Sequence, residues 1–256
     1  METGLHVIVE KPAGVYTKQV EEMNAVAAKH PELVYCMDFN QRTNPLYKKV
    51  KDLIDSGDLG EMTRVIWIVT DWYRSQSYYD QGGWRATWDG EGGGVLLNQN
   101  PHNLDLWQWM CGIPKRVKSQ VYYGKHRNIE VEDDLYALVE YENGATGCYI
   151  TSVGDAPGTN RLEIDGTNGK IVVENNELTF YRLRIPEPEF NATYKGGLGK
   201  PEVWECKIPI KGTYTSHPGI INNFCDCILK GAKPIAPGAE ASVVCRFPTL
   251  FTFRVG

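Results

Sequence analysis

The chain has 256 residues, a length that accommodates one large domain or two modest ones. Hydrophobic residues make up 42% and charged residues 23%, as in ordinary globular proteins. The formal net charge of -5, with no long basic run, argues against nucleic-acid or membrane-surface binding. No apolar run is long enough to span a membrane, and the N-terminal residues lack the pattern of a secretory signal. We therefore expect a cytoplasmic protein with no nucleic-acid or membrane partner.

The seven cysteines are widely spaced, apart from Cys225 and Cys227. This spacing fits neither a paired zinc site nor a secreted disulfide framework. Because their number is odd and the chain is not small, we expect reduced, mostly buried thiols and no metal centre.

The N-terminal segment predicts a strand, a helix and a second strand. A short β-branched run over 6–10 indicates a buried strand that stops at Pro12. An apolar stripe at helical spacing predicts a helix over roughly 17–29, and 33–39 is a second short strand. Two strands joined by a crossover helix pair in parallel, so we expect a parallel pair here.

A second helix has clear start and stop signals. Asn44 is a plausible cap, Pro45 suits the first helical position and Gly57 is placed to end the helix. Beyond it the pattern predicts a strand, a long loop rich in Tyr, Trp, Arg and Gly, and a third helix, over 65–71, 73–94 and 100–110. Loops of such length within a compact domain are usually functional.

From residue 116 onward the pattern changes to strands joined by short turns. Asn143-Gly144 is a strong hairpin signal, because a type I′ turn needs positive φ at both central residues. Such strands form a mostly antiparallel sheet, and the candidates are 116–123, 134–141, 145–153, 160–165, 169–174 and 177–182. Residues 183–217 are predicted to be irregular, and 218–229 to form an amphipathic helix.

A lysine stands directly after the first predicted strand, within Glu10-Lys11-Pro12. Ligands of open α/β sheets collect at the carboxyl ends of parallel strands. Desolvation can lower a lysine pKa towards neutrality, so a lysine there can act as a general acid or base. The alternative is an ordinary surface lysine that follows a strand.

A second candidate group opens the helix predicted over 100–110. It follows the glycine run Gly92–Gly94, which permits close approach of the backbone to a ligand. His102 lies in the first turn, and Asp105 lies one turn later on the same face. A histidine held by a carboxylate can move a proton near neutral pH. Alternatively, both residues merely satisfy backbone groups at the helix start.

Aromatic and arginine side chains gather in and before the 73–94 loop. Trp and Tyr faces pack against sugar rings, and Arg binds hydroxyls, carboxylates or phosphates. A dimer interface favours the same residue types. The candidates are Trp72, Tyr73, Arg74, Tyr78, Tyr79, Trp84 and Arg85. Arg42, just past the second strand, could face the same cleft or bridge two elements.

The order and spacing of these segments resemble the glucose-fructose oxidoreductase/inositol dehydrogenase (Gfo/Idh/MocA) family. The resemblance covers roughly residues 5–182 and rests on VIVEKP, FNQR, SGDLGEM, GGWR, GGGVLLNQNPHNLDLWQWMCG and VEDDLYALVEYENGATG. It implies an α/β (α+β) chain, in which a Rossmann domain precedes an open, mostly antiparallel sheet domain that often forms the subunit interface. It also implies NAD or NADP as cofactor, a sugar or cyclitol hydroxyl as substrate, and a homodimer or higher oligomer.

The resemblance also implies roles for particular residues. Lys11 matches the active-site lysine and His102 the histidine that moves the hydroxyl proton. Asn98 stands where several members have an aspartate, and we expect it to bind a substrate hydroxyl. The implied cofactor contacts are Glu10, Lys11, Pro12, Arg42, Trp84 and Arg85. The implied substrate contacts are Trp72, Tyr73, Arg74, Asn98 and His102.

The resemblance divides the chain near residue 42. Residues 1–42 correspond to the C-terminal remnant of a Rossmann domain, and 43–256 to the substrate and dimerisation domain. Ten residues precede Lys11 and no G-x-G-x-x-G turn is present, so we expect a truncated chain with weak NAD(P) binding and impaired activity. Two alternatives stay open: a non-catalytic, dimerising carbohydrate-binding remnant, and an NAD-using glycosidase of the same superfamily.

The last residues depart from the resemblance. A long amphipathic helix is implied after Pro237, but the segment reads ASVVCRFPTLFTFRVG. Pro248 predicts a break in this helix. A shifted reading frame or gene boundary would account for such an end.

Overall fold

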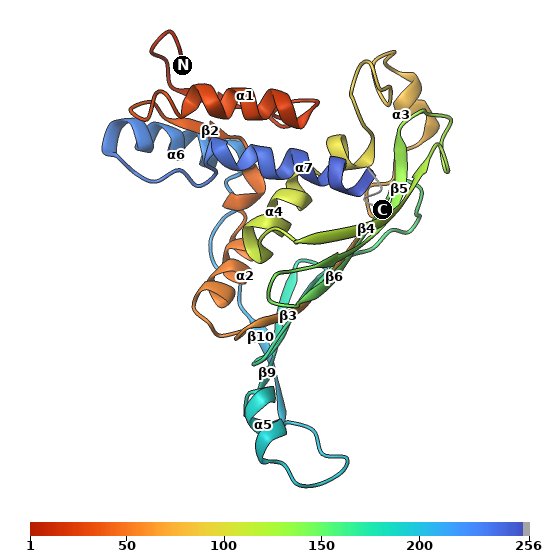
Figure 1. The fold of residues 1–256 in the computed structure, drawn as a ribbon, viewed down its shortest axis with the longest axis vertical. Coiled ribbons are helices and arrows are strands. Elements are labelled where there is room, and N and C mark those ends of the chain that lie inside the picture. Colours follow the sequence, from red (N-terminus) through yellow and green to blue (C-terminus); the bar gives the residue numbers. More distant parts are fainter. Residues whose placement is uncertain (253–256) are drawn as a thin grey trace.

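The computed structural model describes residues 1–252, apart from the side chains of 243 and 248–252. At its N-terminus, β1 (Val7–Val9) pairs in parallel with β2 (Tyr35–Met37), and α1 (Thr17–Ala27) connects them (Figure 1). Val20 of α1 and Met37 of β2 are fully buried, so the crossover helix is anchored to the core. The predicted parallel strand–helix–strand unit is confirmed.

A second sheet has eight strands in the order β10-β9-β8-β7-β3-β6-β5-β4. Their bounds are β3 (Met62–Val69), β4 (Arg116–Tyr123), β5 (Glu132–Glu140), β6 (Thr146–Ser152), β7 (Asn160–Gly166), β8 (Gly169–Glu174), β9 (Glu177–Leu183) and β10 (Val203–Ile208). Neighbouring strands pair antiparallel, except that β3 and β6 run parallel. The predicted mostly antiparallel sheet is therefore confirmed.

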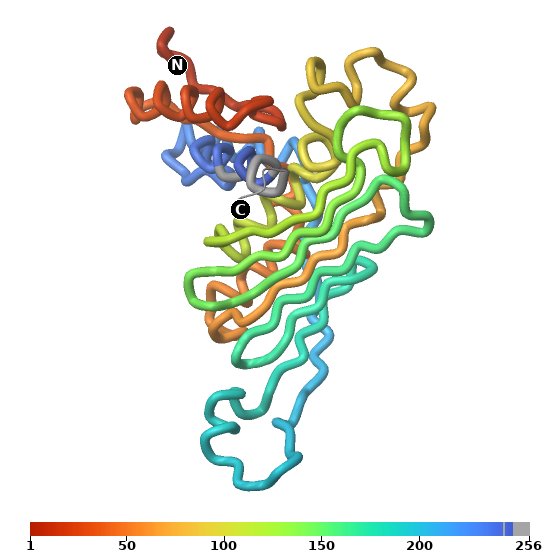
Figure 2. The backbone as a smooth tube through the Cα atoms, turned by 45° about the vertical axis from the view of Figure 1, so that its right-hand side comes forward, coloured from red at the N-terminus to blue at the C-terminus, as the bar shows by residue number. Residues whose placement is uncertain are grey.

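Helices cover one face of this sheet, and Figure 2 shows the strands of the other face with no helix over them. The covering helices include α2 (Pro45–Asp55) and α4 (Pro101–Cys111). Burial alternates along β5, where Ala137 is buried while Tyr136 and Leu138 are exposed. One face of the sheet thus belongs to the core and the other meets solvent. Within residues 1–252, no helix is long and apolar enough to cross a membrane.

Helix α2 begins and ends as the sequence predicts. The Asn44 side chain accepts a hydrogen bond from the Leu46 N–H, and Pro45 is the first helical residue. Just beyond the last turn, Gly57 adopts a φ of 78°, a left-handed conformation that favours glycine.

Two segments predicted to lack regular structure contain short elements. The loop over 73–94 includes α3 (Gln76–Asp80), and 183–217 includes α5 (Glu187–Thr193) and all of β10. With β9, these last two elements form an arm that projects at the foot of the molecule in Figure 1. Most side chains of β10 are exposed, so its sequence lacks the apolar alternation that normally signals a strand.

The C-terminal helices are longer than predicted. Helix α6 (Ser216–Lys230) starts two residues earlier, and α7 (Ala241–Thr252) continues through position 248. The predicted break at Pro248 is therefore wrong, although 253–256 lie outside the described residues. A proline removes one helical hydrogen bond, but Val244 and Phe247 are buried in the core and hold this helix in place.

The C-terminal part of the chain returns to the N-terminal unit. The Met37 N–H donates to the Ala236 carbonyl (3.0 Å), and the Thr17 hydroxyl donates to the Cys245 carbonyl (3.2 Å). Helix α7 accordingly packs against α1. The division of the chain at residue 42 stays a prediction, but residues from both sides of it build this unit.

Candidate active site

Lys11 and Asn98 meet although 87 residues separate them in the chain. Lys11 follows β1, and Asn98 lies in the π-helical turn η2 (Val95–Gln99) that precedes α4. The Lys11 ammonium donates a hydrogen bond to the backbone carbonyl of Asn98, at 3.0 Å. This contact joins the carboxyl end of β1 to the segment that leads into His102.

His102 lies in the first turn of α4, with its ring edge-on to Phe39 at 6.5 Å between centroids. Its Nδ1 is buried and has no hydrogen-bond partner among the described residues. Burial, assisted by the charges of Lys11 and His217, lowers the pKa of His102 to about 4. The imidazole is therefore neutral near pH 7, and its low pKa makes it a weaker proton acceptor than a free histidine.

Asp105 does not hold His102, and the prediction of that pairing is wrong. Its carboxylate instead accepts two hydrogen bonds from the Arg42 guanidinium, at 2.8 and 2.5 Å. Arg42 is 1% exposed and also pairs with Glu240 at 2.6 Å. Of the two roles considered for Arg42, the structure shows the bridge between elements. Its predicted cofactor contact does not fit, because all three of its nitrogens bind protein groups.

Glu91 is a member of the group that sequence reasoning missed. Its carboxylate accepts hydrogen bonds from the Asn98 side-chain amide and from the Ala86 N–H (2.7 Å). Burial raises the pKa of Glu91, and the Ala86 N–H and the charges of Arg85 and Lys11 partly oppose this shift. A carboxylate thus stands beside Lys11 and Asn98, but it comes from the loop rather than from position 98. Its place in a Gly-rich loop without regular structure left no periodic signal.

The aromatic-arginine residues form a stack of alternating rings and guanidinium groups. The Arg74 guanidinium lies 5.4 Å from the Trp72 ring and 5.2 Å from the Tyr78 ring. Arg85 continues the stack, at 4.7 Å from Tyr78 and 4.8 Å from Trp84. The stack is tied to α4 through the Trp72 indole N–H, which donates to the Asn103 side chain at 3.3 Å.

Tyr73 lies apart from this stack. Its ring is 5.0 Å from the guanidinium of Arg127, which belongs to the loop between β4 and β5. The Tyr73 ring thus packs on a different arginine from the stack, although the Arg74 guanidinium donates to the Tyr73 carbonyl at 2.9 Å.

The glycine run before η2 approaches the protein's own chain. A Cβ at Gly94 would lie 1.9 Å from the carbonyl oxygen of Glu132, and one at Gly92 would lie 1.9 Å from Val15. The buried Glu132 carboxylate accepts hydrogen bonds from the N–H groups of Gly94 and Leu96, and burial raises its pKa to about 7. These glycines therefore allow close packing that seats η2, rather than contact with a ligand.

A family model matches the middle of the chain. Residues 47–172 match the GFO/IDH/MocA C-terminal domain. This region of the chain belongs to the Gfo/Idh/MocA family. The α/β fold and the recognised family are therefore confirmed.

Two curated members of the Gfo/Idh/MocA family illustrate the similarity. The scyllo-inositol 2-dehydrogenase (NAD(+)) of Bacillus subtilis is 26% identical over 252 residues, which are 94% of this chain and 66% of that protein. The 1-carboxy-3-chloro-3,4-dihydroxycyclo hexa-1,5-diene dehydrogenase of Comamonas testosteroni is 30% identical over 247 residues, 94% of this chain and 59% of that protein. The chain thus spans less than two thirds of the length of either relative.

Solved structures of dehydrogenases show the same fold. The WlbA dehydrogenase from Chromobacterium violaceum, in complex with NADH and UDP-GlcNAcA, is 26% identical with a TM-score of 0.79. The match covers 97% of this chain and 68% of that one. A levoglucosan dehydrogenase in complex with NADH has a TM-score of 0.78 at 19% identity, which supports the fold alone.

In this Gfo/Idh/MocA protein the predicted site residues fall into two sets. Lys11, Asn98 and His102 come together, with Glu91 added by the structure. Arg42 is removed from the site by its buried ion pairs. The catalytic and binding roles of the remaining residues stay predictions.

Proposed function

We propose that this Gfo/Idh/MocA protein is an NAD(P)-dependent oxidoreductase that acts on a hydroxyl of a sugar or cyclitol. The observation that supports this most strongly is the charge of Lys11 near a buried, neutral His102. Two groups able to bind and move a hydroxyl proton lie together at the carboxyl end of a parallel strand pair. That is where open α/β sheets collect their ligands.

The proton is assigned to His102. Its neutral imidazole accepts the proton of the substrate hydroxyl as the hydride leaves the same carbon. The Lys11 ammonium polarises that hydroxyl, and its bond to the Asn98 carbonyl keeps it in place. The Asn98 amide, held by Glu91, binds a neighbouring hydroxyl. A bound nicotinamide nucleotide supplies the hydride acceptor.

The residues present fit the nicotinamide end of such a cofactor better than its phosphates. Glu10 is exposed and Lys11 partly exposed just beyond the carboxyl end of β1, next to β2. No glycine-rich phosphate turn occurs among the 256 residues. Because phosphate contacts provide much of dinucleotide affinity, we propose that these residues alone bind NAD or NADP more weakly than about millimolar.

The substrate is proposed to lie against the stack of Trp72, Arg74 and Trp84. Trp rings present apolar faces to the C–H surfaces of a sugar, and guanidinium groups bind its hydroxyls. The relatives named above act on an inositol and on a dihydroxylated ring, as their names state. A polyhydroxylated ring is therefore the substrate class that we propose.

A turnover assay tests the proton assignment, using the longest reading frame that contains this sequence. We expect His102→Ala to lower kcat with NAD(P) and the best polyol by roughly 10²–10⁴, with a smaller effect on cofactor affinity. Lys11→Ala should be comparably damaging. His30→Ala, which removes a histidine that pairs with Glu32 at 3.4 Å, is the matched control. Near-normal turnover of His102→Ala across pH 6–9 would refute the assignment.

Self-association through the uncovered face of the large sheet is part of the same proposal. Tyr136 is 44% exposed and Leu138 is 61% exposed on this face, beside Tyr122. Apolar side chains gathered on a sheet face favour a symmetric dimer. Leu138→Asp should shift a dimer towards monomer in sedimentation velocity, and a monomeric parent chain at micromolar concentration would contradict the proposal.

A further inference from the structure

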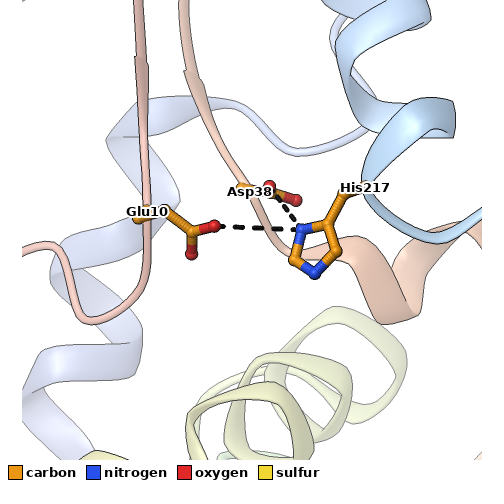
Figure 3. A group of neighbouring side chains, drawn as sticks. All are labelled: Glu10, Asp38 and His217. Atoms are coloured by element: carbon orange, nitrogen blue, oxygen red, sulfur yellow. Dashed lines mark hydrogen bonds and ion pairs between the residues drawn. The ribbon is translucent and has the colours of Figure 1, made fainter.

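We propose that Glu10, Asp38 and His217 form a binding site for one divalent transition-metal ion. The cysteine spacing predicted no metal centre, and Asp38 and His217 are 179 residues apart in the chain. Glu10 follows β1, Asp38 follows β2, and His217 lies in the first turn of α6. Figure 3 shows both carboxylates directed towards the His217 ring.

The spacing of the three side chains suits a single ion. His217 Nδ1 lies 2.6 Å from Asp38 Oδ2 and 3.8 Å from Glu10 Oε1, and the three ligand atoms fall within 4.8 Å of one another. Ligands about 2.1 Å from a cation stand about 3 to 3.4 Å apart. One separation is longer than this spacing and the other is shorter, so Glu10 and His217 would shift by some tenths of an ångström to hold an ion.

The buried carboxylate carries an observation that points to a ligand. Asp38 is 6% exposed, and its Oδ1 has no hydrogen-bond partner among the described residues. Buried carboxylate oxygens are ordinarily satisfied, because an unpaired one loses its hydration without compensation. A cation between Asp38 and Glu10 supplies the missing interaction. Two carboxylates with one imidazole match the preferences of Mn²⁺ or Zn²⁺.

The far side of the His217 ring contacts Asn40. Its other ring nitrogen, Nε2, lies 2.8 Å from the side-chain amide of the buried Asn40. Asn40 is fixed in turn by the Tyr214 hydroxyl, which donates to its amide oxygen at 3.3 Å. Without a metal, the Asn40 amide donates to Nε2 and Nδ1 carries the proton shared with Asp38. A metal on Nδ1 requires Nε2 to carry the proton, and a turn of the Asn40 amide then places its oxygen as the acceptor.

The ion would tie β1, β2 and the start of α6 together, beside Lys11. Because the ligands come from segments far apart in the chain, ion binding favours the folded state. The site does not depend on the proposed oxidoreductase activity, and its test needs no turnover.

A Mn²⁺ titration of the untagged full chain, followed by electron paramagnetic resonance, tests the site. Mn²⁺ is the probe because the seven free thiols are poor ligands for it. We expect one ion per chain and a higher thermal midpoint with Mn²⁺. Asp38→Asn and His217→Gln should weaken binding by 10-fold or more.

Two further variants keep the test decisive if a buried substitution impairs folding. Glu10→Gln changes an exposed side chain and should also weaken Mn²⁺ binding while far-UV circular dichroism stays unchanged. His30→Gln removes a histidine that pairs with a single carboxylate, 3.4 Å away, and should leave binding unchanged. No binding up to 1 mM Mn²⁺ (about −4 kcal/mol) would overturn the proposal. Binding that Glu10→Gln and His217→Gln leave intact would overturn it too.

Discussion

Helix α4 contributes to two polar clusters that differ in whether their buried polar atoms are paired. Asp105, fully buried, is clamped by the Arg42 guanidinium, which Glu240 and the Ile235 carbonyl also bind. One turn earlier, a buried ring nitrogen of His102 has no partner in the described part of the chain. In the first cluster the charged groups are paired with one another, whereas in the second a ring nitrogen can still form a hydrogen bond.

The difference shows how burial can serve either stability or chemistry. A buried ion pair is tolerated only when its charges are fully matched, so Arg42 and Asp105 are left with little capacity for a ligand. A buried imidazole can avoid charge by releasing its proton, so His102 remains neutral and able to accept one. Proximity in one helix therefore does not imply a shared role.

The largest expected effect lies in the first cluster. Arg42→Ala leaves Asp105 as a buried, unpaired carboxylate and should lower the free energy of unfolding by about 3–5 kcal/mol. Urea denaturation measures this loss. Lys115→Ala, which breaks an exposed pair with Glu142, should change stability little. A loss no larger than that of the control would show that the cluster is not a structural clamp.

The next effect is the lowered pKa of His102. NMR titration of labelled histidine should give a value of about 4, against an unfolded value of 6.5. Because the folded pKa is the lower one, His102 contributes stability that is present above pH 6.5 and is lost as pH falls towards 4. Glu132, with a pKa of about 7 against 4.5 unfolded, acts in the opposite direction as pH rises from 4.5 to 7. The titration of the ring itself avoids this overlap, and a value above 6 would contradict the assigned burial.

A smaller effect is expected at Glu91. Glu91→Ala removes its hydrogen bonds to Asn98 and Ala86 and should cost about 1 kcal/mol of unfolding free energy, since the side chain is half-buried. Chemical denaturation measures the change. Asp89→Ala, at an exposed position two residues away, is the control. Equal stability of the two variants would mean that Glu91 does not hold the loop against η2.

The smallest effect tests the link between Lys11 and His102. Lys11→Met removes a nearby positive charge and should raise the pKa of His102 by less than about one unit. The same NMR titration detects the shift. Lys18→Met on the exposed side of α1 should leave the His102 pKa unchanged. An unchanged His102 pKa in Lys11→Met would show that Lys11 and His102 do not interact, contrary to the proposed mechanism.

Local patterns in the sequence were sufficient to predict helices with capping residues and strands with alternating polarity. The Asn44-Pro45 start of α2 and the alternation along β5 depend on neighbouring residues, so they can be read along the chain. The β5–β6 hairpin was predicted at the right place, but its type I′ turn is wrong, because φ is positive at Gly144 and not at Asn143. The family resemblance had already indicated Lys11, Asn98 and His102 as candidate site residues. These local patterns do not predict which group a polar side chain binds in the folded protein.

Tertiary structure alone decided which polar groups meet. Arg42 reaches Asp105 across 63 residues, and Asp38 reaches His217 across 179, distances over which no periodicity persists. Likewise, β10 exists because β9 offers it an edge, and α7 survives position 248 because Phe247 is buried. The sequence by itself therefore determined the local elements and the candidate residues. Packing determined the partners, since desolvation and hydrogen bonding act only between groups that the fold has already brought together.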